Sequence, residues 1–475
     1  MTNVALRDYQ IADLTFYMLN QKCLNLSDAG TGKTPSVCVM QWHQWANLGI
    51  GTVWPQPKSL LKKNKKEILR FTGFKDDEVV IVDGTPKQVQ QQLESGAKVF
   101  LMGFRRLTLS WRKLPDYVKA VHIDEMHMGY KSFDSQNALA LYKMFDTGRM
   151  THFLGMTGTL IDGKLSSAYP AIRIIEPRYY MSPEGFLNQH AIKDADGKVA
   201  AWKNHDKLAK IFGRHAIRRT FASVHGEQEV VHIPEMVDMA PMQRRYYDTF
   251  RDEAVLELEK FYLDGTLPGV AFTRARQLME HPSNFPDLTE PGKFIDIMKG
   301  EPTEKEERLK VHLEEHWLNE KPLIIFTPLI PQQERIAEIL KAMRFKFGVI
   351  NGQQSRKARD QVDEDFQAGR IQVVLATEQT ASFGYNWQFC GEQEVDHEIF
   401  IALGFSDATF VQARQRAIRG PRNSPLRLTT LEYNDSLDQH ICSIIYRKSV
   451  DANKVDPSRP VLQLSGFEGE YKLAA

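Results

Sequence analysis

The chain has 475 residues, of which 42% are hydrophobic and 25% are charged, and its formal net charge is +1. This length predicts two or three domains, and the near-zero net charge excludes a strongly basic protein that coats a polyanion. No apolar run approaches the ~20 residues that span a bilayer, and the N-terminus lacks the basic and apolar regions of a signal peptide. We therefore expect no membrane association and a cytoplasmic protein, in a bacterial or phage-infected cell, or a nuclear one in a eukaryote.

Charge and cysteine distribution add two expectations. Residues 1–160 contain 20 Lys and Arg against 14 Asp and Glu, whereas the remainder contains 41 against 46. A mildly basic first part permits a polyanionic partner without demonstrating one. The cysteines form no Cys-x-x-Cys pair, which favours small buried side chains in a reducing compartment over disulfides or a zinc module; they are Cys23, Cys38, Cys390 and Cys442.

The first motif lies between a short apolar strand, Lys22–Leu26, and an apolar helical pattern that begins after Thr34. It reads Ser27-Asp-Ala-Gly-Thr-Gly-Lys-Thr34, including Asp28, Ala29 and Thr31. Gly30 and Gly32 allow backbone N–H groups to converge on an anion, and the helix N-terminus adds favourable potential. The stretch predicts a phosphate cradle, and a turn without function is the alternative.

Two side chains of this motif have defined expected roles. Lys33 would reach the β- and γ-phosphates of a nucleotide, and the Thr34 hydroxyl would hold Mg²⁺. Ser27 stands where the phosphate-loop pattern usually begins with glycine, so the match is to the second half of the pattern.

About twenty residues earlier, Leu6-Arg-Asp-Tyr-Gln10 opens an amphipathic helix. A glutamine amide can pair with the donor and acceptor edges of adenine, so Gln10 could select ATP. On this stretch alone, an ordinary helix start with exposed polar residues is the simpler interpretation.

Several strands then end in polar residues. Gly51–Trp54 leads to Lys58-Ser59, and Val99–Met102 leads to Phe104-Arg105-Arg106. Loops at the carboxyl ends of parallel strands present binding groups. The lysines between 62 and 66 instead indicate a solvated helix face.

A second motif, which is acidic, follows the apolar strand that contains Val121 and Ile123. Asp124 can hold Mg²⁺ through its water shell, and Glu125 can orient and deprotonate an attacking water. The next strand, His152–Met156, runs into Thr157-Gly158-Thr159. Small hydroxyls at a strand end suit an element that couples the phosphate site to a second ligand.

From residue 162 to about residue 302 the α/β periodicity stops and helices dominate, at Leu208–Phe212, Gln243–Tyr262 and Ala271–Met279. No hairpin signal such as Asn-Gly between alternating strands is evident there. Because strand separation usually requires a wedge, this segment predicts a motor that does not unwind efficiently.

A second α/β series follows, with strands at Leu323–Phe326, Phe347–Ile350, Val373–Ala376 and Ile399–Ala402. Arg416 and Arg419 are three residues apart, which predicts a shared helix face. Arginines aimed at one point fit an anion such as a γ-phosphate, although four arginines on a helix could also serve solubility. The chain after Asp451 is expected to be a loosely ordered tail.

The order of the motifs resembles that of superfamily 2 helicases, and within them the Snf2 branch of DNA translocases. The motifs are Leu6–Gln10, Gly30–Thr34, Pro57–Leu61, Asp124–His127, Thr157–Thr159, Leu323–Phe326, Gly384-Tyr-Asn386 and Gln412…Arg416…Arg419. Arg218-Arg219-Thr220, Met242–Tyr247 and Arg276–Pro282 resemble further Snf2 features. The resemblance covers residues 6–448. Departures such as Tyr385 and Trp387, where the family has leucines, indicate a divergent minimal member, an economy that would suit a phage or mobile element.

The resemblance implies an α/β fold of two RecA-like lobes, residues 1–161 and 303–450, joined by the mainly helical segment 162–302 and followed by the tail 451–475. It implies that ATP and Mg²⁺ bind in the cleft. Arg7 and Gln10 would contact adenine, Arg416 and Arg419 would act as fingers, and Gly384 and Gln412 would couple with Thr157–Thr159. The implied DNA track comprises Lys58, Ser59, Arg105, Thr327, Gly352 and Thr380.

The expected function is therefore an ATP-dependent motor, presumed monomeric, that moves along double-stranded DNA without sequence preference. Two alternatives stay open. One is a strand-separating or branch-migrating helicase in replication or repair. The other is an ATP-switched subunit of an assembly such as RNA polymerase, for which DNA need not stimulate the ATPase. Any protein partner is unknown at this point.

Overall fold

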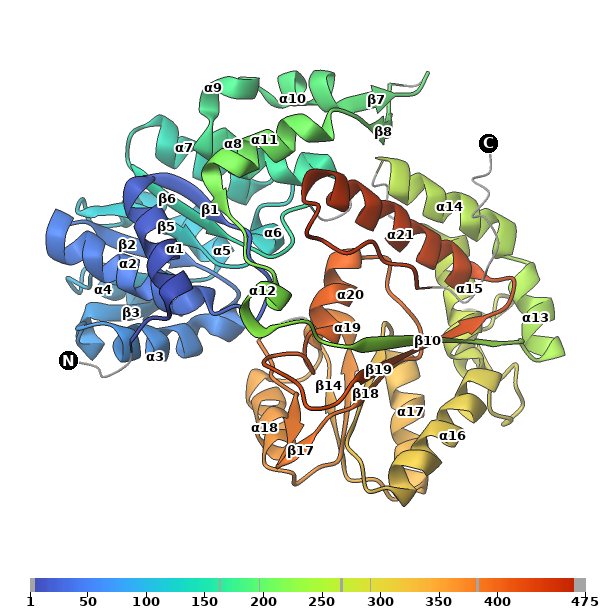
Figure 1. The fold of residues 1–475 in the computed structure, drawn as a ribbon. Coiled ribbons are helices and arrows are strands. Elements are labelled where there is room, and N and C mark those ends of the chain that lie inside the picture. Colours follow the sequence, from blue (N-terminus) through green and yellow to red (C-terminus); the bar gives the residue numbers. More distant parts are fainter. Residues whose placement is uncertain are drawn as a thin grey trace. The chain divides into compact units, whose positions relative to one another are not determined.

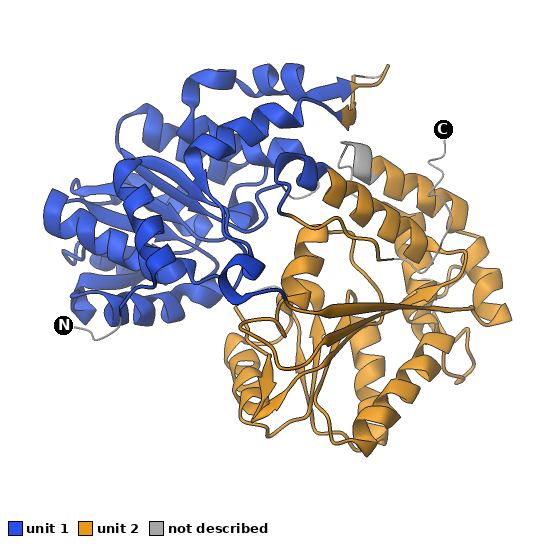
Figure 2. Cartoon of the chain, in the orientation of Figure 1, with its two compact units in different colours: residues 1–192, 202–227, 451–458 blue, residues 193–201, 228–450, 459–475 orange. Residues whose placement is uncertain are grey.

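A computed structural model describes residues 5–161, 164–195, 197–264, 268–290, 292–381 and 384–464. The chain forms two compact units (Figure 2). Within the described residues, unit 1 comprises 5–192, 202–227 and 451–458, and unit 2 comprises 193–201, 228–450 and 459–464. The helix α21 (Leu437–Val455) passes from unit 2 into unit 1 between residues 450 and 451.

Unit 1 is built on a seven-stranded parallel sheet in the order β3-β4-β2-β5-β6-β1-β9 (Figure 1). Its strands are β1 (Lys22–Asn25), β2 (Gly51–Pro55), β3 (Val79–Val82), β4 (Val99–Met102), β5 (Val118–Ile123), β6 (His152–Met156) and β9 (Ala216–Ile217). Its helices include α1 (Asp8–Leu19), α2 (Lys33–Leu48), α3 (Leu61–Phe71), α4 (Pro86–Leu93), α5 (Phe104–Ser110), α6 (Met126–Gly129), α7 (Gln136–Asp146), α8 (Tyr169–Ile175), α9 (Pro177–Tyr180), α10 (Pro183–His190), α11 (His205–His215) and α12 (Phe221–His225).

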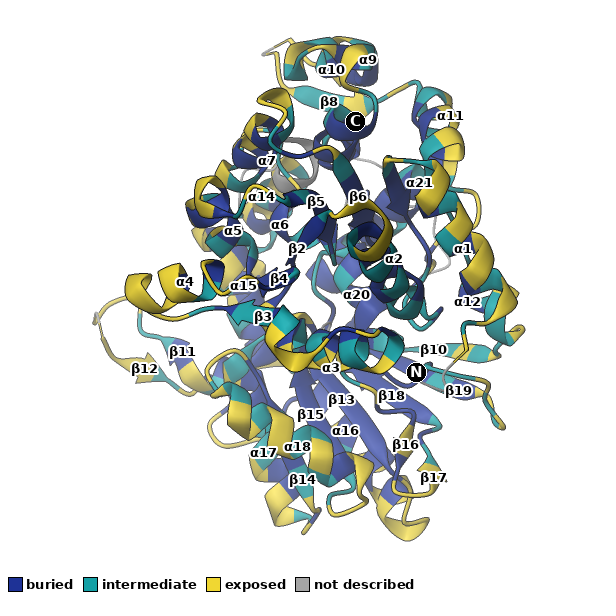
Figure 3. Cartoon of the chain, turned by 90° about the vertical axis from the view of Figure 1, so that its left-hand side faces the viewer, coloured by how far each residue is buried: buried dark blue, intermediate teal, exposed yellow. Residues whose placement is uncertain are grey.

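Both faces of this sheet are buried, because successive strand residues point to opposite sides. In β4, Phe100 and Met102 join one hydrophobic cluster, whereas Val99 and Leu101 join another. This explains why the strands read as continuous apolar runs. In Figure 3 the central strands are coloured as buried, whereas helices such as α4 and α18 carry exposed residues on their outer faces.

Unit 2 is built on a six-stranded parallel sheet in the order β10-β19-β18-β13-β15-β14. Its strands are β10 (Val230–Val237), β13 (Leu323–Thr327), β14 (Phe347–Ile350), β15 (Val373–Thr377), β18 (His397–Phe400) and β19 (Leu426–Tyr433). Its helices include α13 (Pro241–Asp248), α14 (Arg251–Asp264), α15 (Val270–Glu280), α16 (Glu304–Leu318), α17 (Ile330–Ala342), α18 (Arg356–Gln367), α19 (Glu378–Ala381) and α20 (Asp407–Arg414). The expected α/β class with two RecA-like lobes is confirmed.

The segment 162–302 does not stand apart from the two sheets. Residues 202–227 belong to unit 1 and residues 228–302 to unit 2, and the segment supplies β9 and β10 to the two sheets. Strand β9 has two residues, and β10 contains His232, Pro234 and Glu235, so neither has an apolar strand pattern. Proline is tolerated in β10 because this strand lies at the edge of its sheet.

The same segment also contains two small two-stranded sheets, so the expectation that it lacks a hairpin is wrong. One pairs β11 (Phe285–Pro286) with β12 (Phe294–Ile295). Strands β7 (Ala191–Lys193) and β8 (Val199–Trp202) pair across residues 194–198. The backbone N–H of Asp194 donates to the Lys198 carbonyl at 2.8 Å, and the Lys198 N–H donates to the Asp194 carboxylate at 2.8 Å. Gly197 adopts a φ of 79°, a conformation that glycine favours in the loops of hairpins.

The structure also corrects the expectations for one helix and for the C-terminal tail. The helix expected at Gln243–Tyr262 is interrupted at Thr249 and Phe250, between α13 and α14. The expected loose tail begins inside α21, and Leu462 and Leu464 beyond this helix are buried, so the chain is packed through residue 464. Residues 465–475 lie outside the described part.

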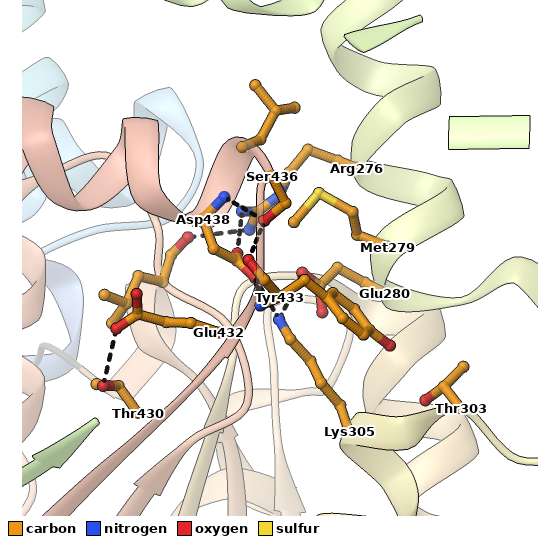
Figure 4. Close-up of polar contacts among 12 residues, drawn as sticks. Arg276, Met279, Glu280, Thr303, Lys305, Thr430, Glu432, Tyr433, Ser436 and Asp438 are labelled. Atoms are coloured by element: carbon orange, nitrogen blue, oxygen red, sulfur yellow. Dashed lines mark hydrogen bonds and ion pairs between the residues drawn. The ribbon is translucent and has the colours of Figure 1, made fainter. Parts of the chain in front are cut away.

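The core of unit 2 contains a cluster of buried charges (Figure 4). The ammonium of Lys305 lies 2.8 Å from Asp438 Oδ2 and 3.4 Å from Glu280 Oε1, and all three side chains are almost fully buried. Arg276 Nη1 lies 3.8 Å from Asp438 Oδ1. Burial by itself lowers the pKa of Lys305, but Asp438 and Glu280 raise this pKa above its ordinary value. The cluster joins α15, α16 and α21.

The four cysteines are buried and unpaired. Across the described ranges, no three His, Cys, Asp or Glu side chains are arranged to hold a metal ion. No described helix is both long enough and apolar enough to cross a bilayer.

Candidate nucleotide site

The sheet order of unit 1 brings the predicted motifs together. Strand β6 lies between β1 and β5, and each of the three is followed by one motif. The phosphate loop follows β1, Thr157–Thr159 follow β6, and Asp124-Glu125 follow β5. Because carboxyl ends of parallel strands meet at one edge, these motifs share one edge of the sheet.

The phosphate loop has the geometry of an anion cradle. Gly30 and Gly32 have φ values of 80° and 71°, a region that favours glycine. A Cβ at Gly32 would lie 2.8 Å from Gln10 Nε2. In the described structure the N–H groups of Gly30, Thr31 and Gly32 donate to no protein acceptor, and Gly32 caps the N-terminus of α2. These donors fit the phosphates of a nucleotide.

Lys33 is held inside the same loop. Its ammonium donates to the carbonyls of Ser27 at 2.7 Å and Asp28 at 2.8 Å. Burial lowers the pKa of Lys33, and Glu125, Asp124 and Asp28 oppose this shift. The lysine therefore lies between the loop and the acidic motif, where a nucleotide phosphate would replace the carbonyls as its partner.

The acidic motif is fixed by β2 and α3. The N–H of Asp124 donates to the Pro55 carbonyl at 3.1 Å, and Asn64 Nδ2 donates to Asp124 Oδ2 at 3.2 Å. Burial, together with the neighbouring Glu125, raises the pKa of Asp124. Glu125 has a φ of 48°, which is uncommon for a residue with a Cβ and turns the chain sharply after the strand. A nearby cation would stabilise the charged form of the buried Asp124 carboxylate. Asp124 therefore fits a Mg²⁺ ligand, and the Thr34 hydroxyl at the start of α2 would be a second ligand.

A histidine connects the acidic motif to the threonine motif. His127 Nδ1 lies 3.6 Å from Glu125 Oε2 and 2.7 Å from Thr157 Oγ1. The N–H of Thr159 donates to the Thr157 hydroxyl at 3.1 Å. A Cβ at Gly158 would lie 3.3 Å from the Ser27 carbonyl, so Gly158 lies directly against the phosphate loop. This is the contact expected of a coupling element.

The N-terminal motif also contacts the loop. Gln10 Nε2 donates to the Gly32 carbonyl at 2.9 Å, and Tyr9 donates from its hydroxyl to the Thr31 carbonyl at 3.0 Å. The Arg7 N–H donates to Gln10 Oε1 at 2.9 Å, and the Arg7 residue is exposed. Gln10 therefore ties α1 to the loop, and its contact with adenine stays a prediction.

The structure adds a segment that residue-by-residue reasoning missed, residues 217–225. The N–H of Leu26 donates to the Ile217 carbonyl at 2.9 Å, and that of Asp28 donates to the Arg219 carbonyl at 2.9 Å. Arg219 also pairs with Asp13 of α1 at 2.7 Å. The resemblance had singled out Arg218-Arg219-Thr220 without a role. About 190 residues separate this segment from the loop, so no local pattern indicates the pairing.

The two predicted finger arginines lie in unit 2, after the end of α20 at Arg414, so the expectation of a shared helix face is wrong. The Arg416 carbonyl accepts from the Trp387 N–H at 2.9 Å. This hydrogen bond takes the place of the one that a continued helix would provide. Both guanidinium groups nevertheless converge: Arg416 Nη1 donates to the Tyr385 carbonyl at 3.2 Å, and Arg419 Nη2 donates to it at 3.0 Å. Gln412 accepts from Arg416 Nε through its carbonyl at 2.7 Å.

Gly384, the other predicted coupling residue of unit 2, has a φ of 78° and is exposed. It directly precedes Tyr385, whose carbonyl accepts from both arginines. Residues 382 and 383 of this stretch lie outside the described part.

The predicted DNA-contact residues of unit 1 follow adjacent strands. Lys58 and Ser59 follow β2, Arg105 lies in α5 after β4, and all three are exposed. Lys58 pairs with Asp83 at 3.1 Å; the Lys58 side chain is mostly exposed, and a little under half of the Asp83 side chain is exposed. These positions border the nucleotide motifs, because β2 is the neighbour of β5.

In unit 2, Thr327, Thr380 and Gly352 follow or end the adjacent strands β13, β15 and β14. Gly352 is exposed and Thr380 is half-buried. Thr327 is fully buried and its hydroxyl donates to the Leu329 carbonyl at 3.1 Å, so in this conformation its side chain offers no group to DNA.

Comparison with protein families decides the relationship. The model described as "SNF2-related domain" matches residues 18–284, more than half of the chain. The chain belongs to the SNF2-related family. The model described as "Helicase conserved C-terminal domain" matches residues 304–421. The family expected from the order of the motifs is confirmed, and with it the class of helicase-type ATPases.

Individual relatives are distant. An uncharacterized ATP-dependent helicase of Mycoplasma pneumoniae is 20% identical over 429 residues, which cover 88% of this chain. The chain spans 38% of the length of that relative. The helicase domain of Hef from Pyrococcus furiosus is 13% identical and covers 92% of this chain and 97% of its own, with a TM-score of 0.53, which supports the fold. The Sulfolobus solfataricus SWI2/SNF2 ATPase core in complex with dsDNA is 17% identical and covers 97% and 98%, with a TM-score of 0.42.

Proposed function

We propose that the chain is an ATP-dependent motor that translocates on double-stranded DNA and thereby remodels DNA or protein–DNA complexes. The observation that carries the proposal is the meeting of three motifs at one sheet edge. There, His127 lies within 3.6 Å of Glu125 and within 2.7 Å of the Thr157 hydroxyl. Gly158 of the coupling motif lies against the Ser27 carbonyl that accepts from Lys33. Membership of the SNF2-related family supports DNA as the substrate.

The roles of the residues follow from their positions. The donors of Gly30, Thr31 and Gly32 bind phosphate oxygens, and Lys33 adds a positive charge beside them. Thr34 and Asp124 would hold Mg²⁺, which would supply positive charge to neutralise the phosphates. Glu125 orients and deprotonates the attacking water.

The two arginines of unit 2 are the proposed arginine fingers. Arg416 and Arg419 already aim at one point, the Tyr385 carbonyl. An anionic γ-phosphate binds guanidinium groups more strongly than a neutral carbonyl does. ATP turnover should therefore fall when either arginine is removed.

The residues that bind DNA would be those that follow the carboxyl ends of the strands in unit 1. Lys58, Ser59 and Arg105 offer an ammonium, a hydroxyl and a guanidinium. Such groups bind backbone phosphates, so binding should be independent of sequence and should weaken steeply with salt. Asp83 competes with phosphate for Lys58.

The test measures ATP hydrolysis with duplex DNA, single-stranded DNA, RNA or no nucleic acid, and triplex displacement on matched duplexes. We expect the strongest stimulation by duplex DNA, together with triplex displacement. Lys58→Ala should lower the affinity for all duplex sequences alike, and Asp83→Asn should raise it. An ATPase indifferent to every nucleic acid would contradict the proposal and favour the ATP-switched subunit.

A strand-separating helicase is the second candidate, because the β7–β8 hairpin is a structural element that such an enzyme can use as a wedge. The turn of this hairpin, residues 194–198, reads Asp-Ala-Asp-Gly-Lys. It has no aromatic side chain that could stack on a base, and its aspartates repel phosphates. We therefore favour translocation, and robust fork unwinding without triplex displacement would reverse this choice.

A further inference from the structure

One side chain, that of Arg218, connects the phosphate loop to the C-terminal part of unit 1. Its Nη1 donates to the Leu26 carbonyl and to Asp28 Oδ1, both at 2.6 Å. On its other side, Nε lies 2.7 Å from Asp456 Oδ2 and 2.9 Å from the Ser458 hydroxyl. About four-fifths of the Arg218 side chain is shielded from solvent.

The loop side of this connection is tightly specified. The carboxylate of Asp28 accepts from Arg218 through Oδ1 and from the Phe221 N–H through Oδ2 at 2.8 Å. The carbonyl of the same residue accepts from the Lys33 ammonium. A displacement of Asp28 would therefore move a partner of the lysine that meets the phosphates.

The C-terminal side is equally defined. Asp456 follows α21, and its other oxygen, Oδ1, accepts from the N–H and hydroxyl of Ser458 at 3.1 and 2.6 Å. This turn presents Oδ2 and the Ser458 hydroxyl to Arg218 together. The Asp456 side chain is about three-quarters buried.

Arg218 is also connected to two of the places where the chain passes from one unit to the other. Nine residues downstream, between 227 and 228, the chain leaves unit 1 and enters β10. The return passage is α21, which enters unit 1 at residue 451 and ends next to Asp456. The backbone connects Arg218 to the first of these places, at residues 227 and 228. The contacts of its Nε with Asp456 and Ser458 connect it to the second, at the end of α21.

We propose that Arg218 is a positioning residue that links both chain passages to the phosphate loop, so that the C-terminal turn at Asp456 and Ser458 sets the affinity of the loop for nucleotide. The inference rests on the proposed ATP site. It adds to that site a residue and a C-terminal segment, neither of which contacts the reacting atoms. Residues after α21 would thus be part of the ATP machinery.

The test uses the full chain with Asp456→Asn and Ser458→Ala, alone and combined, because both are distant from the loop in sequence. We expect the KM for ATP to rise by about 5-fold or more in the double variant, a coupling of ordinary size, with a smaller change in kcat. Arg218→Lys, which keeps the charge but loses the forked contact, should show an intermediate rise. Arg214→Gln is the matched control, since this arginine of α11 is mostly exposed and pairs with Glu176.

A second readout needs no ATP. Hydrogen exchange of the peptide that covers residues 26–34 should be faster in the Asp456→Asn/Ser458→Ala variant than in the wild type, while the Tm stays close to the wild-type value. A merely structural turn would lower the Tm and leave both the KM and loop exchange unchanged, and that result would overturn the inference. If the wild type hydrolysed no ATP, the proposed function would fail, and loop exchange would still decide the role of Arg218.

A double-mutant cycle separates a chain of contacts from independent effects. Asp28→Asn and Asp456→Asn act on opposite sides of Arg218, so their effects on loop exchange should be non-additive. Additive effects would contradict a connection through Arg218.

Discussion

Nδ1 of His127 lies 2.7 Å from the hydroxyl oxygen of Thr157, and this pair joins the acidic motif to the threonine motif. The same nitrogen lies 3.6 Å from Glu125 Oε2. We expect Thr157→Val, which keeps the shape but removes the hydroxyl, to reduce the DNA stimulation of ATP hydrolysis by about tenfold, in line with a coupling free energy of 1–3 kcal/mol. Basal nucleotide binding should change little.

The measurement is ATP turnover at saturating ATP, with and without duplex DNA. Thr157→Ser is the matched control, because it retains the hydroxyl. Equal loss of stimulation in both variants would show that the methyl group, rather than the hydrogen bond to His127, is responsible.

Lys33→Ala and Glu125→Gln should separate binding from cleavage. Lys33 lies among the loop carbonyls where phosphates bind, so its loss should abolish ATP binding or turnover. Glu125 is assigned to the attacking water rather than to the phosphates, so Glu125→Gln should bind ATP and fail to cleave it. Equilibrium binding of a fluorescent ATP analogue and single-turnover hydrolysis distinguish the two, and wild-type hydrolysis by Glu125→Gln would refute its role as the base.

Arg419→Ala should leave nucleotide affinity nearly intact and reduce DNA-stimulated turnover, because an arginine finger is typically worth ~10³–10⁵ in rate. Arg422→Ala is a useful contrast, since Arg422 donates to the Val395 and Ala417 carbonyls inside unit 2 and should affect stability instead. Turnover in the Arg419→Ala protein is measured at saturating ATP and DNA. Unchanged turnover would refute the assignment of Arg419 as an arginine finger.

Lys305→Met should destabilise unit 2 by about 3–5 kcal/mol, because it removes the cation nearest to the buried carboxylates of Glu280 and Asp438. Lys210→Met is the control. Lys210 forms an exposed ion pair with Asp206 and should cost less than ~1 kcal/mol. Urea unfolding measures both, and equal effects would argue that the buried cluster contributes no more than a surface pair.

The stability of unit 2 should fall with acidification. Thr429 donates to His397 Nε2 at 2.8 Å, His397 Nδ1 donates to His316 Nε2 at 2.9 Å, and His316 Nδ1 donates to the Lys321 carbonyl at 3.2 Å. This assignment of donors holds only while both imidazoles are neutral. Burial lowers the pKa of His397 to about 2, and it lowers the pKa of His316 as well. Other titratable groups that act on the pair are His312, Glu315, Lys321, Asp396 and Arg427.

Since the folded pKa of both histidines lies below the unfolded value of about 6.5, the unfolded chain binds more protons below that pH. Their stabilising contribution is complete above pH ~6.5 and declines below it, by up to about 1.4 kcal/mol per pH unit for each histidine. Urea midpoints between pH 7.5 and 5 measure the slope. His397→Gln should flatten it and the control His43→Gln on α2 should not; identical slopes in all three proteins would refute the assignment.

Local sequence determined much of this protein. The observed bounds of β4, β6 and β14 coincide with those expected from apolar runs, because strands buried on both faces must be continuously apolar. The phosphate loop, the acidic pair and the threonine motif were also identified from residue types at strand ends. Their meeting follows from the parallel sheet, in which β5, β6 and β1 are neighbours.

Tertiary structure decided what depends on distant partners. Strand β9 has two residues and acquires its role only by pairing with β1. The turn that carries Arg416 and Arg419 replaces a helix because residues 385–388 supply its hydrogen-bond partners. Arg218 contacts Asp28 and Asp456, which are separated from it by about 190 and 240 residues. Local sequence determines the helix and strand propensities of a segment and which of its faces is apolar. Contacts between distant residues arise only when the folded backbone brings the partners within hydrogen-bonding distance.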